Sequence, residues 1–540
     1  MMRLGPQLVP EWPKLAWVAS LPIAAGEVKI LHGPMVETAD DWIVEAVWAG
    51  DFAKGDFDLT DLGFGTGVRC RQNAVTFVSS GSTLDRLVYC ERNGQWFVSN
   101  SLGALLAVTG LELCDDYDYS QNLKSICRGL GDYVRSLPAS SGSVNLVYFN
   151  NLLWNGREMQ EVDKPDDAPT LDGYQSYRQF LDKSLRLLAA NARAPERHWP
   201  VEFLTTISTG YDSAAVAALV RQIGCRNAVT FRQSRSLWRG SDSGRHIASA
   251  LGLACQEYDR AAREYPHEES LWAMVGRPGV LNWTLFDYPE PLCCFFTGCH
   301  GDKVWERDRS PLTDPFQIPS LGDLGIGEFR LLKGIFHCPV PHWGMRHVHD
   351  IRAISFLDEM APWTLGVTGY DRPIPRRIVE EAGVPRRMFG ILKKNTSHES
   401  VMLWPYSAQA QRSFAAFRSE RGHRSPSRLG AAVARWLCTA ETLAVRNLLG
   451  KLGIDTRARD QLRPDGEYLL FQWGNHELRR AYARALRASG GLDDRALAVP
   501  DRERSASRPR LPTASGLIDV RGPWRSQRAS AEWGLPPAAT

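Results

Sequence analysis

The stretch LTTISTGYDSAAVAALVRQIG, residues 204–224, joins an apolar run to an alanine- and valine-rich run through six small or polar residues. The apolar run that ends before Ser208 predicts a buried β-strand, and the run that begins at Ser213 predicts an α-helix. A short loop with hydroxyl side chains and one acidic residue, Asp212, therefore connects a strand to the N-terminus of a helix.

The loop Ser208–Ser213 would lie where backbone N–H groups are unpaired and the helix dipole is positive, which suits phosphate. Gly210 can adopt positive φ and lets an anion approach the backbone, while Ser208 and Ser213 offer hydroxyl donors. Asp212 beside an anion suggests Mg²⁺ between the two. The alternative is an ordinary capped helix with Asp212 and Ser213 as N-cap residues.

Strand and helix patterns alternate from this point onward. Residues 174–192 have a helical pattern. VEFLTTIS then predicts a strand and SAAVAALVRQIG a helix, and NAVTFR predicts a second strand and SGRHIASALGL a second helix. Alternation at this spacing indicates βαβ units and a parallel sheet, so the expected fold class is α/β.

The other regions differ in pattern. Residues 1–170 are β-rich, with hairpin signals at Asn93-Gly94 and Asn155-Gly156. The acidic, proline-bearing segment Glu161–Gly173 is typical of a linker. Residues 328–485 are mostly helical in pattern and end in an amphipathic helix over 471–486, and the tail rich in Arg, Pro and Ser is expected to be disordered. We therefore predict domains at 1–170 and 171–487, with a tail at 488–540.

Net charge, apolar runs and cysteine spacing argue against several classes of protein. The chain has 540 residues and a net charge of +3, so no global field favours nucleic acid or an anionic membrane. No stretch approaches the ~20 apolar residues of a membrane span, and Met1–Pro13 lacks the apolar core of an export signal. The eleven cysteines form no CxxC pair. We expect a cytoplasmic protein with reduced thiols and no membrane or nucleic-acid partner.

The loop S-T-G-Y-D-S resembles the S-G-G-x-D-S pyrophosphate loop of the N-type ATP pyrophosphatases, which include asparagine synthetase, β-lactam synthetase and the lasso-peptide macrolactam synthetases. Thr209 stands where that family has glycine. The resemblance implies that residues 208–213 bind ATP and Mg²⁺. The strand NAVTFR is similar to the family strand whose end contacts adenine through backbone atoms, which assigns Thr230 and Phe231 to the nucleotide.

A second motif supports the resemblance. The sequence TGCHGDK, Thr297–Lys303, is similar to the family's S-G-x-G-x-D-E motif. Asp302 matches the acid, and Gly298 and Gly301 would lie against the nucleotide. The resemblance implies that Asp212 and Asp302 share a magnesium–pyrophosphate complex. Lys303 replaces the family's Glu and His300 its second Gly. The alternative is a plain turn.

A third stretch, Gly369–His398, resembles the family's helical segment that ends in a basic residue over the ATP site. Lys393 or Lys394 would match the lysine that meets the phosphates and the transition state, where a cation stabilises developing charge. The alternative is a solvated lysine pair.

The N-terminal stretch Tyr89–Ala107 is similar to the glutaminase-type (Ntn) N-terminal domain of asparagine synthetase. That domain uses an N-terminal cysteine, whereas this chain begins Met-Met-Arg and its first cysteine is Cys70. We expect a degenerate domain without glutamine hydrolysis. A separate histidine cluster, His337, His342, His347 and His349, has ligand types for a metal but a spacing typical of no known site.

Together the resemblances imply a PP-loop synthetase domain that follows a β-rich degenerate glutaminase-like domain. The activity that they imply is ATP-dependent amide formation, in which a small-molecule or peptide carboxylate is adenylated, pyrophosphate leaves and an amine accepts the acyl group. The alternatives are a catalytically inactive nucleotide-binding or regulatory homologue, and a tRNA-modifying enzyme that shares the loop.

Overall fold

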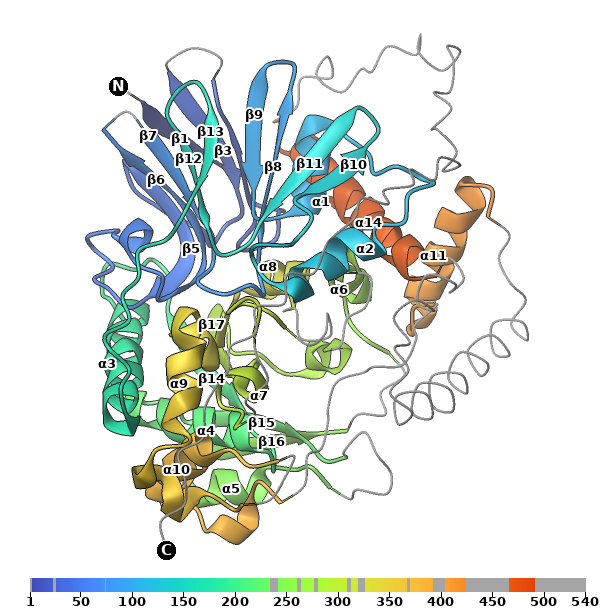
Figure 1. The fold of residues 1–540 in the computed structure, drawn as a ribbon. Helices are drawn as coiled ribbons and strands as arrows, with labels where there is room; N and C mark the ends of the chain where they lie inside the picture. Colours follow the sequence, from blue (N-terminus) through green and yellow to red (C-terminus); the bar gives the residue numbers. More distant parts are fainter. Residues whose placement is uncertain are drawn as a thin grey trace, which may run out of the picture. The chain divides into compact units, whose positions relative to one another are not determined.

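The computed structural model describes residues 2–22, 26–72, 74–233, 241–259, 264–275, 280–307, 312–318, 326–366, 370–391, 404–423 and 466–490 (Figure 1). These residues belong to one compact unit, Met1–Asp493. No helix among them is long and apolar enough to cross a membrane. The predicted tail is outside these ranges, apart from its first residues.

The N-terminal region holds two β-sheets. The seven-stranded sheet has the spatial order β1 (Arg3–Leu8), β3 (Glu27–His32), β2 (Trp17–Ser20), β9 (Gln95–Ser99), β8 (Leu87–Arg92), β11 (Gly142–Val147) and β10 (Ser136–Ala139). The six-stranded sheet has the order β13 (Met159–Val162), β12 (Asn151–Trp154), β7 (Ala74–Val78), β6 (Gly63–Arg71), β5 (Trp42–Trp48) and β4 (Glu37–Thr38). Only the β1–β3 pairing is parallel among the pairings of these described strands.

These two sheets pack face to face because alternate side chains of each face the other. Trp17 of one sheet stacks on Phe77 of the other, with ring centroids 6.3 Å apart. Both predicted hairpins are confirmed: Asn93 and Gly94 have positive φ between β8 and β9, and Gly156 has positive φ between β12 and β13. Asn-Gly turns suit this conformation since glycine lacks a Cβ and asparagine tolerates the left-handed region.

The predicted parallel sheet is confirmed. Its order is β16 (Ala254–Tyr258), β15 (Asn227–Phe231), β14 (Val201–Thr206), β17 (Leu292–Thr297) and β18 (Ile335–Pro339), and all four pairings are parallel. The α/β class therefore holds. The described part of the segment from residue 328 is mostly helical, as predicted, but it also contains β18, an apolar run too short for periodicity alone to separate strand from helix.

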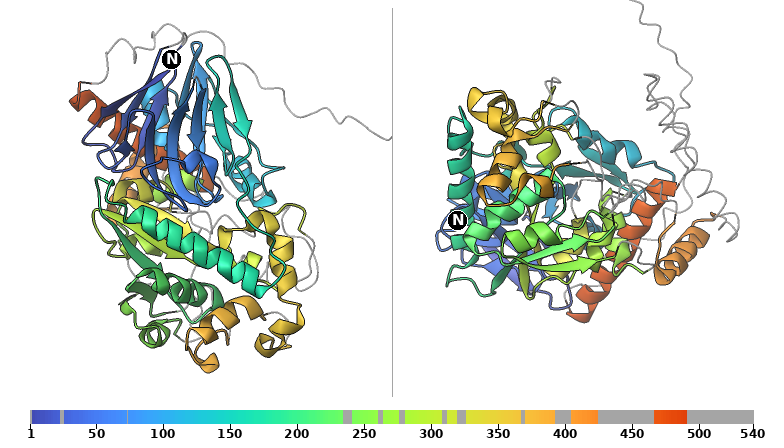
Figure 2. Two further views of the ribbon diagram at one scale, coloured as in Figure 1. Left: turned by 90° about the vertical axis from the view of Figure 1, so that its left-hand side faces the viewer. Right: turned by 90° about the horizontal axis from the view of Figure 1, so that it is seen from below.

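Alternate residues of the central strands face two separate cores. Phe203 and Phe296 belong to the core shared with α3 and α4, whereas Leu204 and Phe295 belong to the core beneath α6 and α14. A sheet covered on both faces needs near-continuous apolar strands, which explains the run Leu292–Phe296. Figure 2 shows helices on both sides of this sheet.

The described helices have the following bounds: α1 Leu102–Thr109, α2 Ser120–Lys124, α3 Tyr174–Ala192, α4 Tyr211–Val220, α5 Arg245–Ala250, α6 Glu268–Val275, α7 Gly301–Val304, α8 Gly327–Lys333, α9 Val348–Ile354, α10 Pro373–Glu381, α11 Ala408–Glu420 and α14 Gly466–Ala488. The predicted helix over 213–224 begins two residues earlier and ends in a 3₁₀ turn, Arg221–Ile223. The predicted C-terminal amphipathic helix is confirmed as α14.

A buried ionic cluster joins the N-terminal sheets to the parallel-sheet region. Arg330 of α8 donates to Glu45 of β5 at 2.8 Å and to Asp85 at 2.8 Å. Glu328 of the same helix accepts from the Ser101 hydroxyl at 2.9 Å. Since burying unpaired charge is costly, these pairs make the juxtaposition of the two regions specific.

Candidate functional site

The order of the parallel sheet brings the two predicted motifs together. From β14 the chain moves to β15 on one side, and later returns to β17 on the other side of β14. The sheet therefore has a topological switch point between β14 and β17, where ligands bind in open α/β sheets. Loop Ser208–Ser213 follows the end of β14, and the loop from Gly298 follows the end of β17.

The two loops are in direct contact through glycines. A Cβ on Gly298 would lie 2.6 Å from the backbone nitrogen of Ser213, and one on Gly301 would lie 2.7 Å from the Cβ of Asp212. Real Cβ atoms do not approach other atoms this closely, so both positions require glycine. The two motifs therefore lie side by side at the carboxyl ends of β14 and β17.

Inside the first loop, two hydroxyls face each other. The Oγ atoms of Ser208 and Ser213 are 2.8 Å apart, and the Gly210 N–H donates to Ser208 Oγ at 3.1 Å. Gly210 is the N-cap residue of α4 and has φ −78°, so positive φ does not explain this glycine. The alternative with Asp212 and Ser213 as N-cap residues is wrong, because both lie in the first turn of α4.

Thr209, the departure from the family pattern, has a local partner. Its hydroxyl donates to Asp242 Oδ1 at 2.6 Å, and its N–H donates to the Asp242 carbonyl at 3.3 Å. Its own carbonyl accepts from the Gly390 N–H at 2.9 Å. Asp242 is 2% exposed. The threonine therefore anchors the loop to two other segments, and no local sequence pattern indicates Asp242 as its partner.

The predicted adenine-contacting residues end the neighbouring strand β15. Thr230 Oγ1 accepts from the Gly244 N–H at 3.0 Å, and the Phe231 ring stacks on Phe286 at 4.8 Å. Both side chains are buried in structural roles. The contact of their backbone atoms with a nucleotide stays a prediction.

An unpredicted arginine occupies the centre of the site. The Arg372 Nη1 atom donates to Asp212 Oδ2 at 2.6 Å, and its Nη2 atom donates to Glu306 Oε2 at 3.0 Å. The Arg372 side chain is 1% exposed. Arg372 lies in the stretch Gly369–His398, but the sequence predicted only the lysines near the end of that stretch, since no local pattern separates Arg372 from the other arginines there.

The electrostatics of the site follow from this arrangement. Burial lowers the pKa of Arg372, but the carboxylates of Asp212 and Glu306 outweigh this effect and raise it above its usual value. Asp302 also raises the pKa of Arg372, which places its carboxylate within electrostatic reach of the guanidinium. Two bonded carboxylates and the charge of a third therefore act on one buried cation.

Tyr211, the variable residue of the loop, ties α4 to α10. Its buried ring lies 4.8 Å from the Tyr370 ring and 5.9 Å from the Phe389 ring, centroid to centroid. Its hydroxyl accepts from Arg376 of α10. The segment 370–391 therefore packs directly on the loop. Lys393 and Lys394 lie outside the described residues, so their assignment stays a prediction.

One histidine of the sequence cluster, His342, packs on His300, which lies outside that cluster. His300 has φ 66°, and its ring lies 4.5 Å from the ring of His342. His337 Nε2 is 2.9 Å from Thr297 Oγ1, and burial lowers the pKa of His337 to about 3. His347 instead pairs with Asp166 at 2.9 Å. Within the described ranges, no three His, Cys, Asp or Glu side chains could together hold a metal ion.

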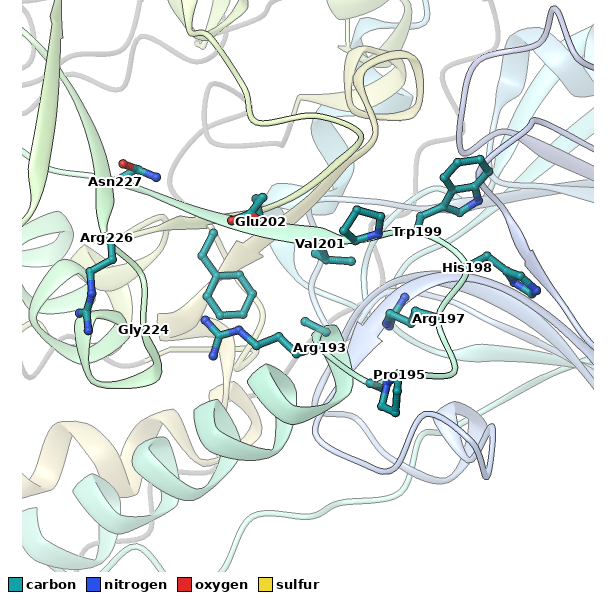
Figure 3. Close-up of a pocket in the computed structure, with 14 residues that line it drawn as sticks. Arg193, Pro195, Arg197, His198, Trp199, Val201, Glu202, Gly224, Arg226 and Asn227 are labelled. Atoms are coloured by element: carbon teal, nitrogen blue, oxygen red, sulfur yellow. The ribbon is translucent and has the colours of Figure 1, made fainter.

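A separate cavity of about 460 Å³ lies at the opposite end of the strands (Figure 3). It is lined by Val201 and Asn227, the first residues of β14 and β15, together with Arg193 and Arg226. Arg193 is engaged there, since its Nη1 atom donates to the Ile223 carbonyl at 2.8 Å. The described lining includes none of the predicted site residues, so this cavity is distinct from the candidate site.

No protein-family model matches the chain, and no curated protein matches it significantly. The site is therefore characterised by its own geometry. Asp212 and Asp302 are carboxylates suited to a divalent cation, and the hydroxyls of Ser208 and Ser213 can donate to phosphate oxygens.

Proposed function

We propose that this chain is an ATP-dependent amide-forming ligase of the asparagine-synthetase type. One observation carries the proposal: the loops S-T-G-Y-D-S and T-G-C-H-G-D, separate in the sequence, meet in van der Waals contact at the switch point of a parallel sheet. Two motifs similar to the two halves of one pyrophosphate site therefore have the juxtaposition that such a site requires.

The residues would divide the work as follows. The first turn of α4 and the hydroxyls of Ser208 and Ser213 would hold the phosphates. Asp212 and Asp302 would hold Mg²⁺, and Gly298 would keep the second loop close enough for both acids to reach it. ATP would activate a substrate carboxylate by adenylation with loss of pyrophosphate, and an amine would then take the acyl group and release AMP.

The N-terminal sheets fit this proposal as a degenerate glutaminase-like region, because two mainly antiparallel sheets pack face to face there. In this proposal the amine is ammonia or, in preference, an amine on the substrate itself. Substrates would be small molecules or peptides with a carboxylate and an amine.

The second candidate is a nucleotide-binding regulatory homologue without turnover. The Arg372–Asp212 bond favours it, since a carboxylate held by a guanidinium is less open to a metal. Lys303, beside the acid Asp302, favours it as well, because a cation replaces the family's Glu.

The test is pyrophosphate release from ATP by the purified full chain, screened against carboxylate–amine substrate pools. Asp212→Asn and Asp302→Asn should each abolish release, while Asp350→Asn on the exposed surface of α9 should not change it. Thermal unfolding with Mg–ATP separates the candidates. Saturation at about a hundred times Kd stabilises the folded state by about 2.7 kcal/mol whether or not turnover follows. Stabilisation without any release would favour the regulatory homologue.

A further inference from the structure

Arg372 is positioned by the fold rather than by chance contacts of a mobile side chain. It immediately precedes α10, whose first residue is Pro373, and α10 packs against α4. Its side chain is almost entirely buried. The guanidinium is thus held at the site before any ligand arrives. Ligand binding therefore costs little further loss of side-chain conformational entropy at Arg372.

The guanidinium bridges two carboxylates from different elements. It bonds Asp212 in the first turn of α4 and Glu306, just beyond α7, with Nε and Nη2 both directed at Glu306 Oε2 at 3.1 and 3.0 Å. Each carboxylate keeps about a fifth of its side chain exposed, at 22%. Both acids can therefore be reached from solvent, whereas a ligand reaches the guanidinium only by displacing one of them.

The positive charge of Arg372 affects whether a metal ion binds at Asp212 alone or together with phosphate. A free divalent cation approaching Asp212 would meet the positive guanidinium at the same carboxylate, and repulsion is strong in a partly buried site. A metal–polyphosphate complex carries net negative charge, and its phosphate oxygens suit an arginine fork. The same residue that opposes the free ion would therefore attract the complex.

We propose that Arg372 is a built-in counter-cation that occupies Asp212 and Glu306 in the ligand-free protein and excludes free divalent metal. Metal then enters only together with a polyphosphate, which takes over the guanidinium as Asp212 is released. This inference rests on the proposed nucleotide site and adds the order in which that site fills.

The test is a titration of the full chain with Mn²⁺ in the absence of nucleotide. The electron paramagnetic resonance signal of free Mn²⁺ measures the binding. We expect weak binding to the wild type and at least about tenfold tighter binding to Arg372→Gln, because the repelling charge is gone. The double variant Asp212→Asn/Arg372→Gln should lose that gain.

The matched control is Arg376→Gln. Arg376 is also buried and lies within α10, just after Arg372, but it bonds the Tyr211 hydroxyl and the Trp363 carbonyl instead of Asp212 or Glu306. Its Mn²⁺ affinity should equal that of the wild type. Equal affinities of the wild type and Arg372→Gln, or a matching gain in Arg376→Gln, would overturn the proposal.

A wild-type experiment keeps the proposal testable if Arg372→Gln does not fold. Mg²⁺ alone should leave the thermal midpoint unchanged, and Mg²⁺ with inorganic pyrophosphate should raise it. A rise with Mg²⁺ alone that equals the rise with both would contradict the counter-cation role.

These experiments can distinguish failure of the counter-cation proposal from failure of the proposed ligase function. A Mn²⁺ gain in Arg372→Gln without any ATP binding by the wild type would uphold the exclusion of free metal by Arg372 and refute the nucleotide site. Pyrophosphate release by the wild type, with equal Mn²⁺ affinities of wild type and variant, would do the reverse.

Discussion

Gly298 and Gly210 lie in the two loops of the site, but a side chain would fit poorly only at Gly298. At Gly298 a Cβ would lie 2.6 Å from backbone atoms of Asp212 and Ser213, which cannot move without shifting α4. At Gly210 the nearest atom is the Ser208 Oγ at 3.3 Å, and φ is −78°. The sequence treats both as loop glycines, but only the structure distinguishes a required glycine from a permitted one.

Gly298→Ala should lower the free energy of unfolding by about 1–3 kcal/mol, as overpacking does, and should weaken Mg–ATP binding. Gly210→Ala should cost less than about 1 kcal/mol, since it replaces only a glycine N-cap. Urea denaturation of both variants measures the difference, and equal losses would contradict the contact between the loops.

His300 takes a left-handed conformation at the position where the resembled motif has glycine. Its φ of 66° is unfavourable for a residue with a Cβ, and its buried packing on His342 offsets that strain. His300→Gly and His300→Ala should both destabilise the chain because both remove the ring. The glycine variant should remain more stable than the alanine variant by about 1 kcal/mol, which thermal unfolding can measure. The opposite order would show that this φ is not strained.

At the scale of elements, the predicted strand–helix alternation is confirmed, but the contacts that hold the loop between β14 and α4 were not predicted. The periodicity of apolar residues is local, so it locates β14, α4, β15 and α5 within a few residues. The Thr209–Asp242 hydrogen bond joins this loop to the segment before α5 and depends on how the two strands pair.

Thr209→Val should lower the free energy of unfolding by about 1.5–3 kcal/mol, because a buried carboxylate loses a hydroxyl donor. Thr209→Ser keeps the donor and should stay within about 0.5 kcal/mol of the wild type. Chemical denaturation of this pair gives the comparison. A serine variant as unstable as the valine variant would contradict the role assigned to the hydroxyl, since serine keeps that donor.

At the scale of the whole molecule, the predicted linker is partly buried. Its first residues belong to β13, and Lys164 is 4% exposed with its Nζ atom 2.6 Å from Asn151 Oδ1. Arg346 also donates to the Lys164 carbonyl at 2.9 Å, so this segment connects the six-stranded sheet to the parallel-sheet region. Composition alone favoured a solvated linker, since charged residues are seldom buried.

Burial lowers the pKa of Lys164 from 10.5 to about 7. Between these values the unfolded chain binds a proton that the folded chain does not, so stability rises with pH from about 7 to about 10.5. Below pH 7 the full cost of the buried charge is present. Lys164→Met should therefore stabilise the protein most at pH 6, with a gain that shrinks towards pH 10.

Urea denaturation across pH 6–10 measures this prediction, with Lys183→Met on the exposed face of α3 as the control. The control should show no comparable pH dependence. A Lys164→Met gain that is constant with pH would mean that the amine is not deprotonated in the folded chain.

The sequence by itself determined the parallel α/β fold, the two hairpins and the pair of loops at the carboxyl ends of β14 and β17. These features depend on apolar periodicity and turn residues close together in the chain, where local conformational preferences act. Only the tertiary structure decided that Arg372, 160 residues away, binds Asp212, and that His300 packs on His342. Such contacts depend on which strands become neighbours, and a local pattern carries no information about partners that topology brings together.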